Sequence, residues 1–213
     1  MKHAVLAFVV TGTLAGAAGA ASAQAFSLGD AYIKGFGGVT WPSGFDTTLT
    51  EEGEQIALPS FDHDTGYTLG VAVGAAVTPN IALELEYAYR KADFTVTDRD
   101  EGDQADGDTS AHAVMVNALY LFGATGAVQP YLGVGIGGAK VDMNASGQNF
   151  DSGTLLAYQV ISGVSYALNP KMSLYAEGRW LQTESGTFEG PEDEGFEGKF
   201  ETFDLLVGMR HRF

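Results

Sequence analysis

The sequence contains no cysteine, which excludes a disulfide framework and any metal site built on thiolates. Its four histidines, at positions 3, 63, 112 and 211, lack the spacing of a metal-binding motif, so we expect no metal ion and no cofactor. Cations are also scarce, since 11 Lys and Arg residues stand against 27 Asp and Glu residues, and the formal net charge is −16. A chain of this charge repels phosphate, which disfavours a nucleic-acid partner.

Long apolar runs are absent after the N-terminus. There, Lys2 precedes an alanine-rich apolar run, and the small residues Ala21-Ser22-Ala23 at its end are suited to cleavage. Residues 1–23 are therefore predicted to be a secretory signal peptide, and residues 24–213 a single domain. No later stretch reaches the roughly 18 apolar residues that a transmembrane helix needs, which argues against a helical membrane span.

What the sequence does contain is alternation, most clearly in its last eleven residues, 203–213. One side of an extended strand there is nearly all apolar and carries Phe203, Leu205, Val207, Met209 and Phe213, with His211 among them. The other side carries Asp204, Leu206, Gly208, Arg210 and Arg212. A strand with one side suited to lipid and one charged side, ending on an aromatic residue, is typical of the closing strand of a transmembrane barrel.

The same period-2 pattern recurs in seven earlier segments. These are residues 31–40, 66–77, 81–91, 112–122, 130–141, 154–168 and 172–182. The connections between successive segments alternate between long and short, and the long ones span 42–64, 92–111, 142–153 and 183–199. The sequence therefore predicts an all-β fold, an eight-stranded antiparallel up-and-down transmembrane β-barrel closed by pairing of the first and last strands.

Most of the acidic residues lie in the four long connections, whereas the predicted strands and short turns hold few of them. Short turns on one side and long loops on the other are the usual asymmetry of outer-membrane barrels. We therefore expect a protein of the cell outer membrane with long extracellular loops and with both termini periplasmic.

Three stretches resemble the small outer-membrane β-barrel family of the OmpA/OmpX type and the opacity type. They are TPNIALELEYAYR (78–90), PYLGVGIGGAKV (130–141) and AYQVISGVSYALNPKMSLYAEGRWLQ (157–182), and the terminal Phe fits as well. The resemblance covers nearly all of the mature chain except the long loops. It implies the fold and the membrane, but the family includes adhesins, structural anchors and small pores, so it does not imply one function.

The predicted lumen carries a set of charged residues. They are Lys34, Glu84, Glu86, Glu177, Arg179, Arg210 and Arg212, with Arg90 and Asp204 as further candidates. An eight-stranded barrel has an interior just wide enough for side chains to fill, and charges buried there should pair. We favour the interpretation that these pairs hold the barrel shut; a gated ion path through them is the alternative.

Two other groups of residues are candidate sites. The acidic residues between Asp98 and Asp108 could attract Ca²⁺, but their order does not fit an EF-hand loop, and a solvated loop is the simpler interpretation. Ser110 and His112 are two residues apart and would share a strand face, but no third group orients them as in a hydrolase. We therefore expect no enzymatic activity.

The predicted function is that of a non-enzymatic surface or structural protein, a monomer displaying acidic loops for envelope integrity, adhesion or surface interaction. Its expected partners are outer-membrane lipid and lipopolysaccharide, the barrel-assembly machinery through the C-terminal strand, and an extracellular or host partner through the loops. A narrow porin-like channel is the first alternative, and an enzyme that modifies outer-membrane lipid is the second.

Overall fold

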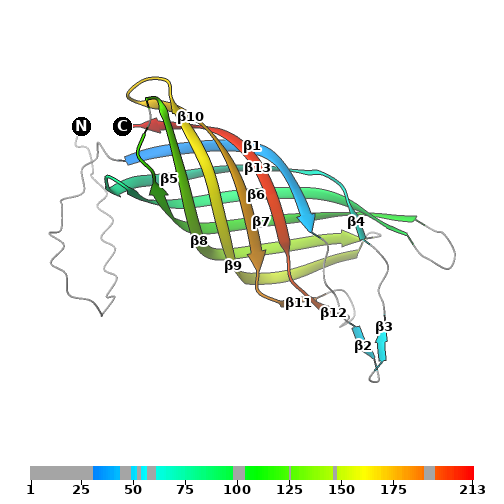
Figure 1. Cartoon of the computed structure of the whole chain (residues 1–213). Coiled ribbons are helices and arrows are strands. Elements are labelled where there is room, and N and C mark those ends of the chain that lie inside the picture. The colour runs from blue at the N-terminus through cyan, green and yellow to red at the C-terminus, as the bar shows by residue number, and fades with distance from the viewer. Residues whose placement is uncertain are drawn as a thin grey trace, which may run out of the picture.

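The computed structural model describes residues 31–43, 49–51, 54–56, 61–97, 104–124, 126–145, 148–189 and 195–213 (Figure 1). These residues form strands, turns and short connections, and no helix among them is long and apolar enough to cross a membrane. The predicted signal peptide, residues 1–23, lies outside the described residues.

Eight long antiparallel strands form a closed barrel, which confirms the predicted fold. They are β1 (Ala31–Ser43), β5 (Gly66–Thr78), β6 (Ile81–Thr97), β7 (Gln104–Leu121), β8 (Val128–Ala145), β9 (Gln148–Ala167), β10 (Met172–Thr183) and β13 (Glu201–Arg212). Each pairs with its neighbours in the chain, and β13 pairs with both β10 and β1, so the wall has no free edge. Lipid requires such closure because an unpaired strand edge would leave polar backbone groups unsatisfied.

Five short strands lie outside this ring. They are β2 (Leu49–Glu51), β3 (Glu54–Ile56), β4 (Phe61–His63), β11 (Gly186–Glu189) and β12 (Gly195–Gly198). The β2–β3 pair is a separate small sheet, β4 pairs with β6, and β11 pairs with β12 and with β9. All five lie within the predicted connections 42–64 and 183–199, at the end of the barrel that we call the loop end (Figure 1).

The opposite end, the turn end, holds the three short turns and both ends of the described barrel (Figure 1). The first and last strands meet there, because the Phe213 amide donates a hydrogen bond to the Ala31 carbonyl at 3.2 Å. The three short turns therefore lie between the strands where the sequence predicts them.

The strands at the loop end are longer than predicted. Residues 92–111 were predicted to be a long connection, but β6 continues to Thr97 and β7 begins at Gln104. Most of 142–153 also belongs to β8 and β9, and 183–199 contains β11 and β12. The prediction is wrong here because acidic residues on an outward face resemble those of a loop. Beyond the apolar belt, however, that face meets water, and the backbone pairing can continue.

The two faces of the wall differ as lipid and lumen would require. Large apolar side chains cover the outside on every long strand, and Val207, for instance, is 67% exposed. On β13 the outward residues are Phe203, Leu205, Val207 and Met209, and Phe213 is exposed directly after the strand. An apolar surface of this extent would be unstable in water and fits the hydrocarbon of a bilayer.

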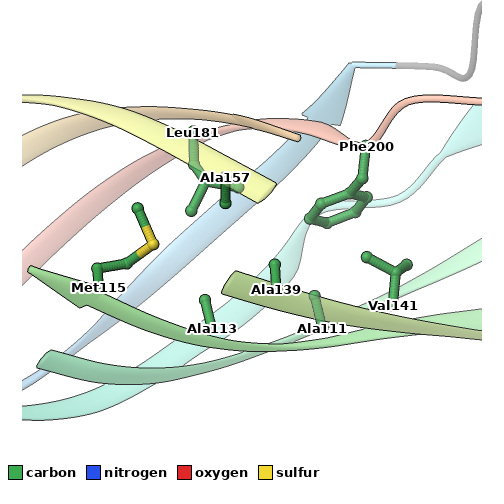
Figure 2. Close-up of a cluster of buried hydrophobic side chains, with 8 residues drawn as sticks. All are labelled: Ala111, Ala113, Met115, Ala139, Val141, Ala157, Leu181 and Phe200. Carbon is green, nitrogen blue, oxygen red and sulfur yellow. The ribbon is translucent and has the colours of Figure 1, made fainter. Parts of the chain in front are cut away.

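Inward-facing side chains fill the barrel. At the turn end the buried apolar cluster consists of Tyr32, Ala82, Leu119, Leu121, Tyr131 and Ile161. At the loop end a second cluster contains Ala111, Ala113, Met115, Ala139, Val141, Ala157, Leu181 and Phe200, whose side chains converge between the strands (Figure 2). The buried charged residues adjoin both clusters, since Arg90 is paired with Ala111 in the β6–β7 ladder and Arg210 lies over the rings of Tyr32 and Tyr131.

Candidate functional site: the charged interior

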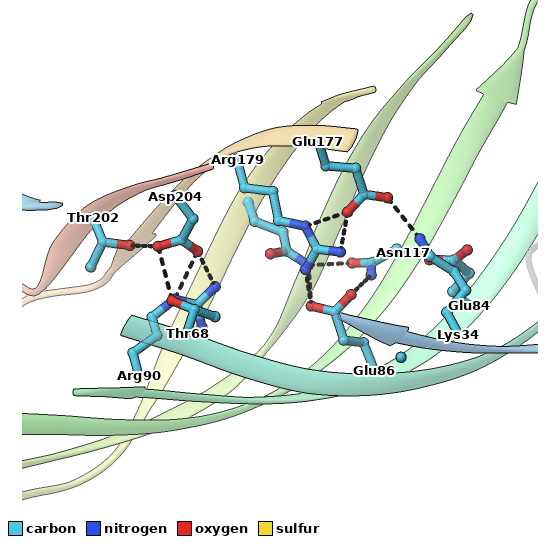
Figure 3. Close-up of polar contacts among 12 residues, drawn as sticks. Lys34, Thr68, Glu84, Glu86, Arg90, Asn117, Glu177, Arg179, Thr202 and Asp204 are labelled. Atoms are coloured by element: carbon cyan, nitrogen blue, oxygen red, sulfur yellow. Dashed lines mark hydrogen bonds and ion pairs between the residues drawn. The ribbon is translucent and has the colours of Figure 1, made fainter. Parts of the chain in front are cut away.

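One network of ion pairs crosses the barrel between β1, β6 and β10 (Figure 3). Lys34 Nζ lies 2.7 Å from Glu177 Oε1 and 3.3 Å from Glu84 Oε2. Arg179 donates from Nη1 to Glu86 Oε1 at 2.5 Å and from Nε to Glu177 Oε2 at 2.8 Å, while its Nη2 also contacts Glu177. All five side chains are buried, so these charges interact at low effective dielectric.

Neutral donors complete the coordination of the three carboxylates. Tyr32 Oη donates to Glu84 at 2.7 Å, and Tyr131 Oη donates to Glu177 at 2.6 Å. Asn117 Nδ2 donates to Glu86 at 3.2 Å, and Gln159 Nε2 donates to the Asn117 amide oxygen at 2.6 Å. A buried charge is tolerated when ion pairs and hydrogen bonds both satisfy it, and these donors meet that condition.

Aromatic rings support the two cations of this network. Lys34 Nζ lies 4.4 Å from the ring centre of Tyr175, and the Arg179 guanidinium lies 4.5 Å from that of Phe36. Both rings belong to a third buried cluster, with Ala88 and Leu206. The cations are therefore fixed by carboxylates and also by ring faces, which attract positive charge.

A second, separate ion pair lies nearer the loop end, on the left of Figure 3. Arg90 donates from Nε and Nη2 to the same Asp204 oxygen, at 3.0 and 2.8 Å. Thr68 and Thr202 hydroxyls donate to the other oxygen at 3.4 and 3.3 Å. Arg90 and Asp204, which were only further candidates from the sequence, are thus a principal buried pair.

Arg210 is buried close to the turn end without a carboxylate partner among the described residues. Its guanidinium lies 4.9 Å from the ring centre of Tyr32 and 5.9 Å from that of Tyr131, and its Nε and Nη2 atoms have no hydrogen-bond partner there. Arg212 departs from the prediction, because it is exposed at the end of β13 instead of lying in the buried network. It has the inward parity, but the strand reaches the rim before a partner can cover it.

The buried charges balance among the described residues. The cations are Lys34, Arg90, Arg179 and Arg210, and the anions are Glu84, Glu86, Glu177 and Asp204. The excess negative charge of the chain therefore lies outside the described interior. Chemically, the interior is suited to holding the wall together, because its carboxylates are occupied by fixed cations.

Tyrosine, histidine and ion pairs lie on the outside of the wall near the loop end. His112 Nδ1 is 2.8 Å from Tyr87 Oη, and its ring lies 4.9 Å from that of Tyr89. The Asp108 carboxylate lies 3.4 Å from the Lys91 ammonium, and both side chains are partly exposed. Such residues are typical of the depth at which lipid headgroups begin.

The structure also locates the Ser110–His112 pair and part of the acidic stretch 98–108, the two other candidate sites of the sequence. His112 contacts Tyr87 on the exposed outer face, so the Ser110–His112 pair would face the membrane interface. Residues 98–103, the centre of the acidic stretch considered for Ca²⁺, lie outside the described residues. Among the residues that the structure describes, no group of three His, Asp or Glu side chains could hold a metal ion.

Sequence reasoning did not single out the neutral members of the interior, namely Tyr32, Tyr131, Asn117, Gln159, Thr68 and Thr202. They could have been sought among the inward-facing strand positions, because every buried carboxylate requires hydrogen-bond donors. This requirement narrows the choice of strand positions but does not say which donor reaches which oxygen.

An apolar exterior around a closed wall and a charged, filled interior define a membrane-spanning β-barrel protein. Residues 8–210 match the outer membrane protein beta-barrel domain, and the chain belongs to that family. It is therefore a small β-barrel protein of the outer membrane.

Solved structures of outer-membrane proteins share the fold. The chain is similar to OprG from Pseudomonas aeruginosa, with 17% identity and a TM-score of 0.61 over 86% of this chain and 96% of that one. Neisserial surface protein A gives 17% identity and a TM-score of 0.59, over 86% and 97%. AlkL, solved in lipid bilayers, gives 18% and 0.55, over 92% and 96%. No curated protein matches the sequence. At these identities the similarity establishes the fold and leaves the function to the site.

Proposed function

We propose that this protein is a non-enzymatic surface or structural barrel whose interior does not conduct, and whose acidic loop end faces the outside of the cell. The observation that carries the proposal is the cross-barrel network in which Arg179 joins Glu86 to Glu177 while Lys34 joins Glu177 to Glu84. The described interior offers no free carboxylate for a passing cation, and buried apolar clusters fill the rest of the described lumen.

An ion crossing the barrel would have to separate these pairs. Removing one partner of a buried ion pair costs roughly 3–5 kcal/mol, because the other charge stays buried and uncompensated. Opening the network disturbs more than one such pair at once. A sealed lumen is therefore the stable state, and the narrow-channel alternative would need a coordinated rearrangement of β1, β6 and β10 side chains.

The orientation of the barrel in the membrane is inferred from the difference between its turn end and its loop end. Short turns and both chain ends at one end are usual for the periplasmic side of such barrels, and long connections for the extracellular side. In this orientation most of the acidic residues are displayed to the surroundings. Their proposed role is in envelope integrity, adhesion or surface interaction, including contact with lipopolysaccharide or a host partner, while β13 is the segment offered to the barrel-assembly machinery.

The absence of an enzymatic role is also part of the proposal. His112 is hydrogen-bonded to Tyr87, and among the described residues no carboxylate contacts it. A lipid-modifying activity would need a nucleophile, a base and an orienting group held together.

The experiment is single-channel recording of the refolded protein in a planar bilayer, with Arg179→Gln and Glu84→Gln as interior variants. The wild type should be silent, and Arg179→Gln should give openings, because it leaves Glu86 and Glu177 without their shared cation. Lys91→Gln, outside the lumen, is the matched control and should stay silent. Stable wild-type openings whose conductance changes in the interior variants would replace this proposal with that of a narrow channel.

A further inference from the structure

The outward face of β10 interrupts the apolar belt with two small residues. Outward positions along this strand are Leu174, Ala176, Gly178 and Trp180, so large residues flank two small ones. Ala176 is paired with Val164 on β9 and with Val207 on β13. The larger side chains of Val164 and Val207 therefore project farther from the wall than Ala176 between them.

At Ala176 the outer wall has an apolar groove of about 660 Å³ near the turn end, and Gly178 is not among its lining residues. Its lining includes Val164, Tyr166, Leu174, Ala176, Val207 and Met209. This volume lies within the range of small-molecule sites, about 300–1,000 Å³, and such sites are mostly apolar. Because the groove opens onto the lipid-facing side, a hydrocarbon chain of the bilayer is the occupant that its lining fits.

Two cations lie at the rim beyond the groove. Lys171 is in the β9–β10 turn and Arg212 ends β13, and both are exposed. Their backbones touch, since the Arg212 amide donates to the Lys171 carbonyl at 2.7 Å. Lys171 is three residues from Leu174, and Arg212 three from Met209, which corresponds to about 10 Å along a strand.

The three short turns at this end contain no Asp or Glu, so no carboxylate of the turns offsets the charges of Lys171 and Arg212. Positive charge at headgroup depth attracts anionic lipid, by about 1 kcal/mol for each Lys or Arg. The groove therefore suits an acyl chain and the two rim cations suit a phosphate, and one lipid molecule can span the distance between them.

We propose that this groove binds one acyl chain of an anionic phospholipid of the surrounding bilayer, and that Lys171 and Arg212 hold its phosphate. The site needs only the membrane-spanning barrel and does not depend on whether the interior conducts. It also places a specific lipid at the seam between β10 and β13, beside the strand that closes the wall (Figure 1).

The test is native mass spectrometry of the refolded full chain, released from micelles that contain equal amounts of phosphatidylglycerol and phosphatidylcholine with identical chains. The wild type should retain one phosphatidylglycerol in preference to phosphatidylcholine. The double variant K171Q/R212Q should lower that preference by about thirtyfold, since each cation contributes a factor of roughly five. The control K91Q/K140Q removes two cations at the other end of the barrel and should leave retention unchanged.

A second pair of variants tests the groove itself. Ala176→Leu fills it and should abolish retention of the lipid. Ala118→Leu is the matched control, because Ala118 is also exposed on the outer face, between Leu83 and Val134 on the opposite part of the wall. Inorganic phosphate should not displace the lipid, because it has no chain for the groove.

Three results would overturn the proposal. Equal retention of the two lipids would remove the phosphate contact. Retention that survives Ala176→Leu would reduce the effect to general attraction of anionic lipid to a basic rim, and displacement by inorganic phosphate would make it a plain anion site. Each variant is first checked for folding by its heat-dependent migration in detergent gels, and Ala176→Gly, which enlarges the groove, replaces Ala176→Leu if the latter fails to fold.

Discussion

Two buried arginines in the same lumen have different surroundings. Arg179 contacts two carboxylates and one ring, whereas Arg210 lies on two tyrosine rings and contacts no carboxylate among the described residues. Residue type and inward parity, which are all that the sequence gives, are the same for both. The difference comes from register across the barrel, since Arg179 and Glu86 are 93 positions apart in the chain.

This contrast predicts different costs for the same substitution. Arg179→Met should destabilise the folded barrel by about 3–5 kcal/mol, because it leaves Glu86 and Glu177 buried with too little positive charge. Arg210→Met should cost much less, since it removes no ion pair within the described interior and keeps an apolar stem against Tyr32. Urea-induced unfolding in lipid vesicles measures both, and equal costs would contradict the assignment of Arg179 as the centre of the network.

At the scale of single strands, the glycines are of two kinds. Some stand where a side chain would not fit, and others stand where a side chain would have room. A Cβ at Gly163, on the inward face of β9, would lie 2.5 Å from the Tyr131 ring. A Cβ at Gly178, on the outward face of β10, would find its nearest neighbour, the Phe203 ring, at 3.6 Å. The Tyr131 ring thus covers Gly163, and its hydroxyl still reaches Glu177.

Gly163→Ala should therefore destabilise the barrel by about 1–3 kcal/mol, the usual cost of overpacking a filled interior. Gly178→Ala should be neutral or slightly stabilising, because a glycine inside a strand is itself unfavourable and the added methyl has room. The two variants carry the same chemical change on adjacent strands, and their unfolding midpoints in urea can be compared directly. A loss at Gly178 as large as that at Gly163 would contradict the close approach of Tyr131.

Strand identity and facing could be predicted from the sequence, whereas strand ends could not. The alternation of Leu83, Leu85 and Tyr87 with Glu84 and Glu86 is strong because lipid lies on one side and the lumen on the other. Beyond the belt that contrast disappears. Asp93 and Asp108 are paired on the outward face of the continuous β6–β7 ladder. In the sequence, acidic residues of this kind cannot be distinguished from those of a loop.

For the whole molecule, closure makes the eight long strands interdependent. A chain that ends at residue 200 would lack β13 and would leave two unpaired edges, on β1 and β10, inside the membrane. Such edges cannot be satisfied in hydrocarbon. We therefore expect the truncated chain to form no protease-resistant barrel in vesicles, whereas the full chain does.

The matched control removes a part of the chain that the wall does not use. Replacing residues 49–56 with a short linker deletes β2 and β3, which pair only with each other. Protection from protease should then remain, because the wall keeps all its strand pairings. Protection of the chain lacking β13 would show that the wall can close without it.

The pairing of β13 with β1 also makes the strand order circular. The two ends of the described barrel already meet at the Phe213 amide and the Ala31 carbonyl. A linker joining them, with new termini opened at the Pro79–Asn80 turn, would preserve all eight pairings. In that circularly permuted chain β13 and β1 would be consecutive strands, and the wall would be closed by pairing of β5, now the last strand synthesised, with β6, now the first. The seam would thus move from the β13–β1 pair to the β5–β6 pair while every pairing stayed the same, which would separate the sequence of β13 from the act of closing the wall.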